Sequence, residues 1–403
     1  MAVIVQKYGG SSVASVEKLR EVADRIIRTQ RQGHQVAVVV SAMGDTTDEL
    51  LAMAKQVSAT PPRRELDMLL SAGERIAMAL LSMALRELGG DAISFTGSQS
   101  GIITNDRHVD ARIIEVRPAR VHDALALGKI VVIAGFQGVS QQKEVTTLGR
   151  GGSDTTAVAM AAALDAGYCE ICSDVDGVYS ADPRVVAAAR RIGILSYEET
   201  QEMAQAGARV LNAHAVEFAK AKGISIYARA TKGPLPGEDP SSDGTVVRKT
   251  TPRAPGTIVG VASERDIVLL KAEAPAAEIS AVLDDRGVTG KQFHTFGART
   301  TITLSRENLH DEPHLKAALE SRFGGRAQLV DGLGTVTLVG GGINLSTASI
   351  RAGADVLGRA GIAVDGTATS AFGITWMVPR DRTEDAVRRL HQRFIESADS
   401  PLP

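Results

Sequence analysis

The segment VIVQKYGGSS, residues 3–12, joins an apolar run directly to a lysine and a pair of glycines. The apolar run predicts a buried strand at Val3–Gln6, and the spacing of the next apolar residues predicts a helix at Val16–Arg31. Glycines between a strand and a helix let backbone N–H groups approach an anion closely, and the helix dipole favours that anion. With the charge of Lys7 beside it, the turn is either a phosphate cradle or a plain glycine turn next to a surface lysine.

Short apolar runs and amphipathic stretches continue to alternate along the first half of the chain. The predicted strands are Val3–Gln6, Val36–Ser41, Ile93–Phe95, Ile130–Ala134 and Tyr168–Ser173, and the predicted helices are Val16–Arg31, Leu50–Val57, Glu65–Leu88, Arg117–Leu127 and Thr155–Ala166. This alternation indicates an α/β fold, a three-layer αβα sandwich around a mostly parallel sheet.

The second half has a different pattern. Residues 231–255 are rich in Pro, Gly, Ser and Asp and predict a domain boundary, although Gly244–Arg248 within them can form an edge strand. Beyond the boundary, two successive β-α-β-β-α units indicate two ferredoxin-like α+β modules. We therefore expect one domain over residues 1–250 and a second region over 256–403, with modules at about 264–331 and 332–397.

The elements expected in this second region follow the same two-unit order. The predicted strands are Asp266–Lys271, Gln292–Phe296, Thr300–Leu304, Ala327–Val330, Val336–Val339, Ala363–Thr369 and Ile374–Val378, and the predicted helices are Pro275–Asp285, Glu312–Phe323, Thr347–Ala360 and Thr383–Phe394.

Composition narrows the class of protein. The 403 residues are 44% hydrophobic with a formal net charge of -2, which argues against a nucleic-acid partner or an anionic membrane surface. Only two cysteines occur, Cys169 and Cys172, and their spacing on a strand places them on opposite faces, so we expect neither a disulfide framework nor a metal site. No signal peptide and no apolar run of about 18 residues is evident, so a soluble cytoplasmic protein is expected.

Two further loops are candidate ligand sites. The small-residue turn Ser41-Ala42-Met43-Gly44 follows the second predicted strand, where open α/β sheets bind ligands, although such turns are common. The loop Gly149–Thr156 runs into an alanine-rich helix, and its Arg150 can pair with a carboxylate or a phosphate. Ser153 or Asp154 could simply cap the helix. Three glycines and an arginine exceed what a cap needs, which favours a ligand-binding loop.

An acidic segment, SDVDGVY at 173–179 and ADPR at 181–184, follows the strand Tyr168–Ser173. Acidic residues at a strand end can hold Mg²⁺ through its water shell, or bind ribose hydroxyls. The alternative is an Asx turn, in which Asp and Gly serve backbone geometry. The chain lacks a G-x-x-x-x-G-K-[ST] motif, so a P-loop nucleotide site is excluded.

Together these segments resemble the aspartate kinases of the amino acid kinase family. The segments that match, in family order and spacing over nearly all of residues 1–250, are VQKYGGSS, SAMGDTTDELL, DMLLSAGERIA, SFTGSQSGI, AGFQG, TTLGRGGSDTTAVA and CEICSDVDGVYSADPR. The resemblance implies that ATP, with Mg²⁺, phosphorylates the β-carboxylate of L-aspartate to give 4-phospho-L-aspartate and ADP. That reaction would open the biosynthesis of lysine, threonine and methionine.

The resemblance also implies a role for individual residues. Those expected to be catalytic are Lys7, Arg150 and Asp154. Those expected to bind aspartate are Ser41, Thr47, Glu74, Arg150, Gly151, Gly152, Ser153 and Asp154, with Glu74 and Asp154 taking the ammonium and Arg150 the α-carboxylate. Those expected to bind the nucleotide are Lys7, Gly9, Gly10, Ser11, Ser173, Asp174, Tyr179, Asp182, Arg184 and Arg209, the last where the family usually has lysine. No side chain is expected to ligate a metal directly.

The chemistry of acyl phosphate formation agrees with such a site. A carboxylate is already ionised at neutral pH, so the nucleophile needs no general base. The obstacle is repulsion between that carboxylate and a polyanionic triphosphate, so the protein must supply positive charge and alignment. Lys7, Arg150, helix N-termini and Mg²⁺ have the required charge.

The second half departs from the family at positions that would line an effector pocket. In aspartate kinases this part forms two ACT modules that bind feedback amino acids, with one module inserted within the other, which implies a further strand at Gly256–Ser263 that belongs to the later module. Here Glu273-Ala274-Pro275-Ala276 and Ser346-Thr347-Ala348 lack the family's usual glycine at the helix start, and Val288-Thr289-Gly290-Lys291 replaces an Asn-Ile-Asp segment. Ala371 stands where the family usually has glutamate. We therefore expect weak or absent feedback by lysine and threonine, and a homodimer formed through these modules.

Two rival functions remain open at the level of sequence. One is the same chemistry on another small amino-acid carboxylate in a specialised pathway. The other is a catalytically silent amino-acid sensor, against which the intact set of Lys7, Glu74, Arg150 and Asp154 argues.

Overall fold

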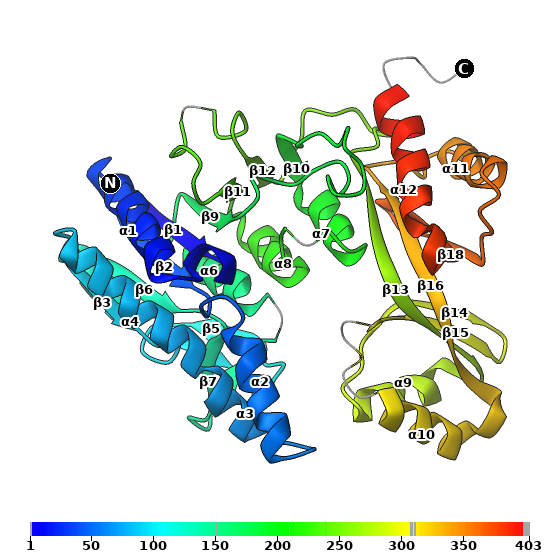
Figure 1. Cartoon of the computed structure of the whole chain (residues 1–403), viewed down its shortest axis with the longest axis horizontal. Coiled ribbons are helices and arrows are strands. Elements are labelled where there is room, and N and C mark those ends of the chain that lie inside the picture. The colour runs from blue at the N-terminus through cyan, green and yellow to red at the C-terminus, as the bar shows by residue number, and fades with distance from the viewer. Residues whose placement is uncertain are drawn as a thin grey trace. The chain divides into compact units, whose positions relative to one another are not determined.

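The computed structural model describes residues 2–149, 151–208, 210–237, 239–306, 309 and 312–397, and the chain divides into two compact units. The first unit comprises Met1–Val178, Arg191–Gln201 and Arg209–Pro252. The second comprises Tyr179–Arg190, Glu202–Ala208 and Arg253–Pro403. Figure 1 shows the helices and strands of both.

The first unit is built on an eight-stranded sheet in the order β10-β12-β11-β9-β1-β2-β6-β3. All neighbours are parallel except β11 and β12. The strands are β1 (Val3–Tyr8), β2 (Gln35–Val40), β3 (Ala92–Phe95), β6 (Ile130–Ala134), β9 (Tyr168–Ser173), β10 (Ile194–Ser196), β11 (Ile226–Ala230) and β12 (Thr245–Arg248). The predicted parallel α/β sheet is confirmed.

Helices pack on both faces of this sheet, because alternate side chains of each strand point to opposite sides. Tyr8 of β1 joins the apolar core formed with α1 and α4, whereas Lys7 points toward α6 on the other face. The helices of this unit are α1 (Val16–Arg31), α2 (Thr46–Val57), α3 (Arg63–Leu70), α4 (Ala72–Glu87), α5 (Ala119–Ala126), α6 (Gly152–Ala163), α7 (Tyr197–Gln205, which continues into the second unit) and α8 (Ala213–Lys222).

A second, four-stranded sheet in the order β5-β4-β7-β8 was not expected from the sequence. Its strands are β4 (Ile102–Thr104), β5 (Ile113–Val116), β7 (Gln137–Ser140) and β8 (Val145–Thr147). They are three or four residues long and partly polar, so neither length nor periodicity marks them. The sheet connects α3 to the loop that begins α6.

Two predictions for the first unit are wrong in detail. The single helix predicted at Glu65–Leu88 is two helices, α3 and α4, separated at Ser71. The carbonyl of Ser71 accepts a hydrogen bond from Gln137 Nε2 at 2.9 Å. The strand predicted at Gly244–Arg248 exists as β12, but it lies between β10 and β11 rather than at the edge.

The second unit contains a six-stranded antiparallel sheet in the order β14-β15-β13-β16-β18-β17. Its strands are β13 (Gly260–Glu273), β14 (Gly290–Phe296), β15 (Arg299–Ser305), β16 (Ala327–Val339), β17 (Gly366–Thr369) and β18 (Gly373–Pro379). Its helices are α9 (Ala276–Asp285), α10 (Glu312–Phe323), α11 (Ala348–Arg359) and α12 (Thr383–His391). The chain order is β-α-β-β-α repeated twice, as predicted.

The two repeats share one sheet because their first strands are long and paired with each other. The strands expected separately at Gly256–Ser263 and Asp266–Lys271 are one strand, β13, and those expected at Ala327–Val330 and Val336–Val339 are one strand, β16. The register of β13 on β16 shifts near Glu264–Leu269, where polar residues break the apolar pattern. One apolar core forms around α9 and α10, and another around α11 and α12.

Among the residues that the structure describes, the helical stretch Arg63–Glu87 is long and apolar enough to cross a bilayer by length and composition alone. Core helices of soluble proteins meet the same criterion. Ala77, Leu81 and Leu85 of this stretch are fully buried in the core with α1, so the stretch is weak evidence for a membrane span.

Candidate active site

The carboxyl ends of four neighbouring parallel strands lie side by side in the first unit. The register aligns the last or nearly last residues of β9, β1, β2 and β6, which are Cys172, Tyr8, Val40 and Ala134. Backbone hydrogen bonds continue the alignment beyond the strands: Gly9 N–H donates to Cys172 O at 3.3 Å and Gly135 N–H donates to Val40 O at 3.0 Å. Four adjacent turns therefore begin at one edge of the sheet, which is where open α/β sheets bind ligands.

Lys7 and Asp154 meet at this edge. Lys7 Nζ lies 2.6 Å from Asp154 Oδ1, and the two side chains are only 12% and 11% exposed. The contact has the distance of an ion pair, but Asp154 Oδ1 has no partner with hydrogen-bond geometry. The structure thus brings together two of the three residues predicted to be catalytic. The third, Arg150, lies outside the described residues.

The first two predicted loops are in direct contact. Gly44 N–H donates to Gly10 O at 3.1 Å. A Cβ on Gly10 would lie 3.0 Å from Ala42 O and 3.1 Å from Gly44 O, so only glycine allows this approach. Gly9 lies on the other side of the same turn, where a Cβ would be 3.4 Å from Lys7 Nζ. The lysine and the glycine turn therefore lie side by side in one cradle, and phosphate binding there stays a prediction.

Glu74 occupies the first turn of α4 and is 3% exposed. Its Oε1 accepts a hydrogen bond from Ala42 N–H at 3.1 Å, which joins it to the second loop, while its Oε2 has no partner. Burial raises the pKa of this carboxyl to about 7, against the opposing effect of hydrogen bonds from the backbone N–H groups of Glu74 and Ala42. A buried carboxylate with a free oxygen is suited to bind a cation.

Two other residues, Ser41 and Thr47, were predicted to bind aspartate. The Ser41 N–H donates to Tyr8 O at 3.1 Å, so Ser41 continues the edge formed by β1 and β2. Thr47 lies in the first turn of α2 and is partly buried.

The glycine loop, residues 149–154, leads into α6. Gly151 adopts the left-handed conformation with φ of 69°, and a Cβ there would lie 2.2 Å from Asn212 Nδ2. Ser153 and Asp154 are 7% and 8% exposed, and a Cβ on Gly135 would approach Ser153 Oγ to 2.8 Å. The loop is thus packed against both the end of β6 and the start of α8, which positions it beside Lys7.

The nucleotide segment begins at the end of β9. Ser173 O accepts hydrogen bonds from Thr231 N–H at 2.8 Å and from Thr231 Oγ1 at 3.0 Å. Thr231 Oγ1 also lies 2.6 Å from Ser12 Oγ, just beyond Ser11, so the segment is tied to the first glycine turn. Asp174 is exposed at this edge.

The other residues predicted to bind the nucleotide belong to the second unit or lie outside the described residues. Tyr179, Asp182 and Arg184 lie in the second unit, where Asp182 Oδ2 pairs with Arg184 Nη2 at 2.7 Å. Arg209 lies outside the described residues.

Sequence reasoning missed two residues that shape the site. Asn212 caps α8 by accepting hydrogen bonds from His214 and Ala215 N–H groups, and it also packs against Gly151. An asparagine directly before a helix is a signal that could have identified it. Phe136, which follows Gly135, has a positive φ of 66°, a strained conformation for an aromatic residue. Its N–H donates a hydrogen bond to Thr156 Oγ1. No local signal marks it.

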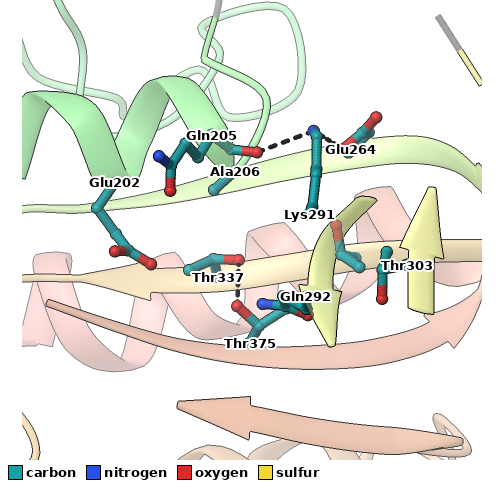
Figure 2. Close-up of a pocket in the computed structure, with 10 residues that line it drawn as sticks. Glu202, Gln205, Ala206, Glu264, Lys291, Gln292, Thr303, Thr337 and Thr375 are labelled. Carbon is teal, nitrogen blue, oxygen red and sulfur yellow. Dashed lines mark hydrogen bonds and ion pairs between the residues drawn. The ribbon is translucent and has the colours of Figure 1, made fainter. Parts of the chain in front are cut away.

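A separate polar pocket lies in the second unit, between the end of α7 and the face of the antiparallel sheet (Figure 2). Lys291 of β14 donates to Gln205 O at 2.9 Å and pairs with Glu264, and burial raises the pKa of Glu202 on the same helix end. The other lining residues are Ala206, Gln292, Thr303, Thr335, Thr337 and Thr375. None of the lining residues was predicted as a catalytic, aspartate-binding or nucleotide-binding residue, and only Lys291 lies in a segment that was expected to line an altered effector pocket.

Comparison with known proteins identifies the family to which the chain belongs. A model of the amino acid kinase family matches residues 2–229. The chain is 45% identical to the aspartokinase of Mycolicibacterium smegmatis over 98% of this chain and 96% of the relative. The aspartokinase of Corynebacterium glutamicum is 42% identical at the same coverage. The chain belongs to the aspartokinases of the amino acid kinase family.

Solved aspartokinase structures share the whole fold. A crystal structure of Escherichia coli aspartokinase III in complex with aspartate and ADP (R-state) superposes with a TM-score of 0.83 at 25% identity, covering 97% of this chain and 99% of that one. The same enzyme in complex with lysine and aspartate (T-state) gives a TM-score of 0.72 at 26% identity, with 98% and 99% covered. The aspartokinase fold therefore extends over both units.

Proposed function

We propose that this aspartokinase transfers the γ-phosphoryl group of ATP to the β-carboxylate of L-aspartate, giving 4-phospho-L-aspartate and ADP. The observation that carries the proposal is the meeting of Lys7 and Asp154 at aligned strand ends, in a chain whose whole length matches aspartokinases. The rival functions, a kinase for another carboxylate and a silent sensor, are not favoured by these relatives.

The residues divide the work by charge. Lys7, beside Gly9 and Gly10, would offset the negative charge of the transferring phosphoryl group. Asp154 holds the Lys7 ammonium at 2.6 Å before substrates bind, which fixes its direction. Because the attacking carboxylate is already ionised, alignment of the two anions is the main contribution of the protein.

The aspartate-binding residues are assigned to the second loop, the first turn of α4 and the glycine loop. Glu74 and Asp154 would receive the ammonium of aspartate, Arg150 its α-carboxylate, and Ser41, Thr47, Gly151, Gly152 and Ser153 would line the same side. The free Oε2 of Glu74 supports this assignment, because a bound ammonium would supply the missing partner.

The nucleotide side is assigned to Lys7, Gly9, Gly10, Ser11, Ser173, Asp174, Tyr179, Asp182, Arg184 and Arg209. Among the described residues no group of three or more His, Cys, Asp or Glu side chains could hold a metal ion. Mg²⁺ usually keeps several waters and binds through one or two carboxylates together with substrate phosphates. An exposed Asp174 at the strand end fits a Mg²⁺ ion delivered with the nucleotide, which would neutralise phosphate charge.

Several broader assignments belong to the same proposal. Residues 1–250 form the catalytic domain, and 256–403 form a regulatory region with modules at about 264–331 and 332–397. The enzyme works in the cytoplasm as a homo-oligomer joined through these modules, and its product feeds the biosynthesis of lysine, threonine and methionine. Feedback control is weakened, because Lys291 in the altered segment is already engaged with Glu264 and Gln205 O.

A hydroxylamine trapping assay tests the reaction. Purified protein supplied with ATP, Mg²⁺ and aspartate should yield aspartyl hydroxamate with stoichiometric ADP, and glutamate or N-acetylglutamate should not replace aspartate. Absence of trappable acyl phosphate from folded protein would contradict the proposal.

A lysine substitution tests the role of the cradle. Lys7→Ala should lower kcat by roughly 10²–10³, the usual loss for one preorganised electrostatic group. Lys129→Ala is the matched control, because Lys129 also makes a 2.6 Å ion pair, with Asp91, but precedes β6 at the amino edge of the sheet. Near-normal turnover of Lys7→Ala would refute the role of Lys7.

A further inference from the structure

Asp67 is a completely buried carboxylate outside the residues assigned to the site. It lies on α3 and is 0% exposed. Its Oδ1 accepts hydrogen bonds from Thr147 Oγ1 at 2.5 Å and from Val109 N–H at 3.0 Å, and its Oδ2 lies 2.6 Å from His108 Nδ1. One side chain thus holds three groups from two other segments of the chain.

The first segment that Asp67 holds is the loop 105–111. Asn105 closes this loop by accepting a hydrogen bond from Arg112 N–H at 3.1 Å. Within it, Val109 carries φ of 72°, which is an outlier for a β-branched residue. Such strain persists only where surrounding contacts determine the conformation. Here that contact is the hydrogen bond from Val109 N–H to Asp67 Oδ1.

The second segment is the end of β8, which runs into the glycine loop. Thr147 is the last residue of β8, and Gly149 follows two positions later. Gly149 also has a positive φ, of 73°, and a Cβ there would lie 3.1 Å from Asp110 Oδ1 and 3.5 Å from Val109 O. The strained loop is therefore packed against the first glycine of the loop that bears Ser153 and Asp154.

The helix that directly follows α3 carries Glu74, a second buried carboxylate, which is assigned to aspartate binding. Asp67 on α3 precedes Glu74 on α4 by seven residues, with the joint at Ser71 between them. The joint is fixed from the small sheet, because Gln137 Nε2 donates to Ser71 O. A displacement of α3 relative to β8 would therefore change the positions of both the glycine loop and Glu74, which are assigned to aspartate binding.

We propose that Asp67, with His108, is a positioning residue that sets the glycine loop for aspartate binding. Removing the charge of Asp67 should loosen the hold on Val109 and Thr147, so that the loop samples other conformations and aspartate binds less tightly. The inference rests on the proposed assignment of this loop to aspartate. It predicts an effect on one substrate rather than a general loss of activity.

The test is a steady-state comparison of Asp67→Asn with Glu144→Gln. Glu144 is a matched control because it pairs with Arg64 of the same helix, at 2.9 Å, on the surface of the same small sheet. Asp67→Asn should raise KM for aspartate roughly tenfold, with KM for ATP within about twofold of the parent. Glu144→Gln should leave both constants unchanged. Equal changes in the two KM values, or a lower Tm with both KM values unchanged, would overturn the proposal.

A second pair of variants guards against failure of Asp67→Asn to fold. His108 is 23% exposed and so tolerates replacement better. His108→Ala should raise KM for aspartate several-fold, and His108→Asn, which retains a hydrogen-bonding group near Asp67, should recover part of the loss. Failure of His108→Asn to improve on His108→Ala would count against the pair.

Ser153→Ala separates this inference from the assignment on which it rests. If Ser153→Ala and Asp67→Asn both change KM for ATP instead, the loop serves the nucleotide, yet Asp67 still positions it. If Ser153→Ala changes KM for aspartate while Asp67→Asn and His108→Ala do not, the positioning role is wrong.

Discussion

The pKa of Glu74 leads to a pH dependence that can be calculated. In the substrate-free protein burial raises this pKa from the ordinary 4.5 to about 7. If the carboxylate form receives the ammonium of aspartate, kcat/KM for aspartate should follow the ionised fraction, which is about 9% at pH 6 and about 91% at pH 8 for a pKa near 7. We therefore expect kcat/KM to rise roughly tenfold between these pH values.

The same shift should change stability in the opposite direction. A carboxyl whose pKa is higher in the folded state binds its proton more tightly when folded, so its contribution is full below pH 4.5 and is lost as pH rises through about 7. A difference of about 2.5 between the two pKa values corresponds to about 3 kcal/mol. Glu74→Gln should abolish this fall in the free energy of unfolding, measured by urea titration at each pH.

The role of Glu74 is tested by KM for aspartate and by the pH profile of kcat/KM, each measured in Glu74→Gln and in one control variant. The control is Glu202→Gln, because burial raises the pKa of Glu202 as well but that residue lies in the second unit. Glu74→Gln should raise KM for aspartate and flatten the pH profile of kcat/KM, whereas Glu202→Gln should retain the profile. A flat profile in the parent enzyme, or an unchanged profile in Glu74→Gln, would refute the reasoning.

Two further predictions follow from the glycine loop and from the second unit. Gly151→Ala should destabilise the protein by about 1–3 kcal/mol and reduce kcat/KM for aspartate. The reason is that φ of 69° is strained for alanine and that its Cβ would lie 2.2 Å from Asn212 Nδ2. Thermal unfolding measures the first effect and steady-state kinetics the second, and unchanged values would contradict the packing of Gly151 against Asn212. Activity measured across a lysine and threonine titration should fall little, and strong inhibition at modest concentration would disprove the weakened feedback.

The sequence predicted the large sheet well because its central strands are buried on both faces. β2 and β6 consist of continuous apolar runs, which are typical of strands covered by helices on both sides. The small sheet escaped notice because β4 and β8 have three residues each, with threonines at buried positions. The joint at Ser71 escaped as well, because the apolar spacing continues across it, and its hydrogen bond from Gln137 joins residues remote in sequence.

The candidate site could be proposed from the sequence where glycine and charge coincide at a strand end. Lys7 and Gly10 stand in such a turn, and the structure places them in one cradle with Gly44. Glu74 could not be derived from spacing, because its role depends on the contact with Ala42 and came only from the family resemblance. Asp67 gave no signal at all, since its partners lie about 40 and 80 residues further along the chain.

Three buried carboxylates of the first unit differ in how completely their oxygens are paired, and that difference separates structure from function. Glu170 on β9 is paired with Arg25 at 2.6 Å and with Gln6 at 2.7 Å, and Asp67 receives three groups. Glu74 Oε1 accepts a hydrogen bond from Ala42 N–H, whereas Oε2 has no hydrogen-bond partner among the described residues. An unpaired buried acceptor costs free energy, so its retention calls for an explanation, and a ligand that supplies the partner is one. The incompletely paired carboxylate is the one at the aligned strand ends, beside the second loop, where a cationic substrate group would complete it.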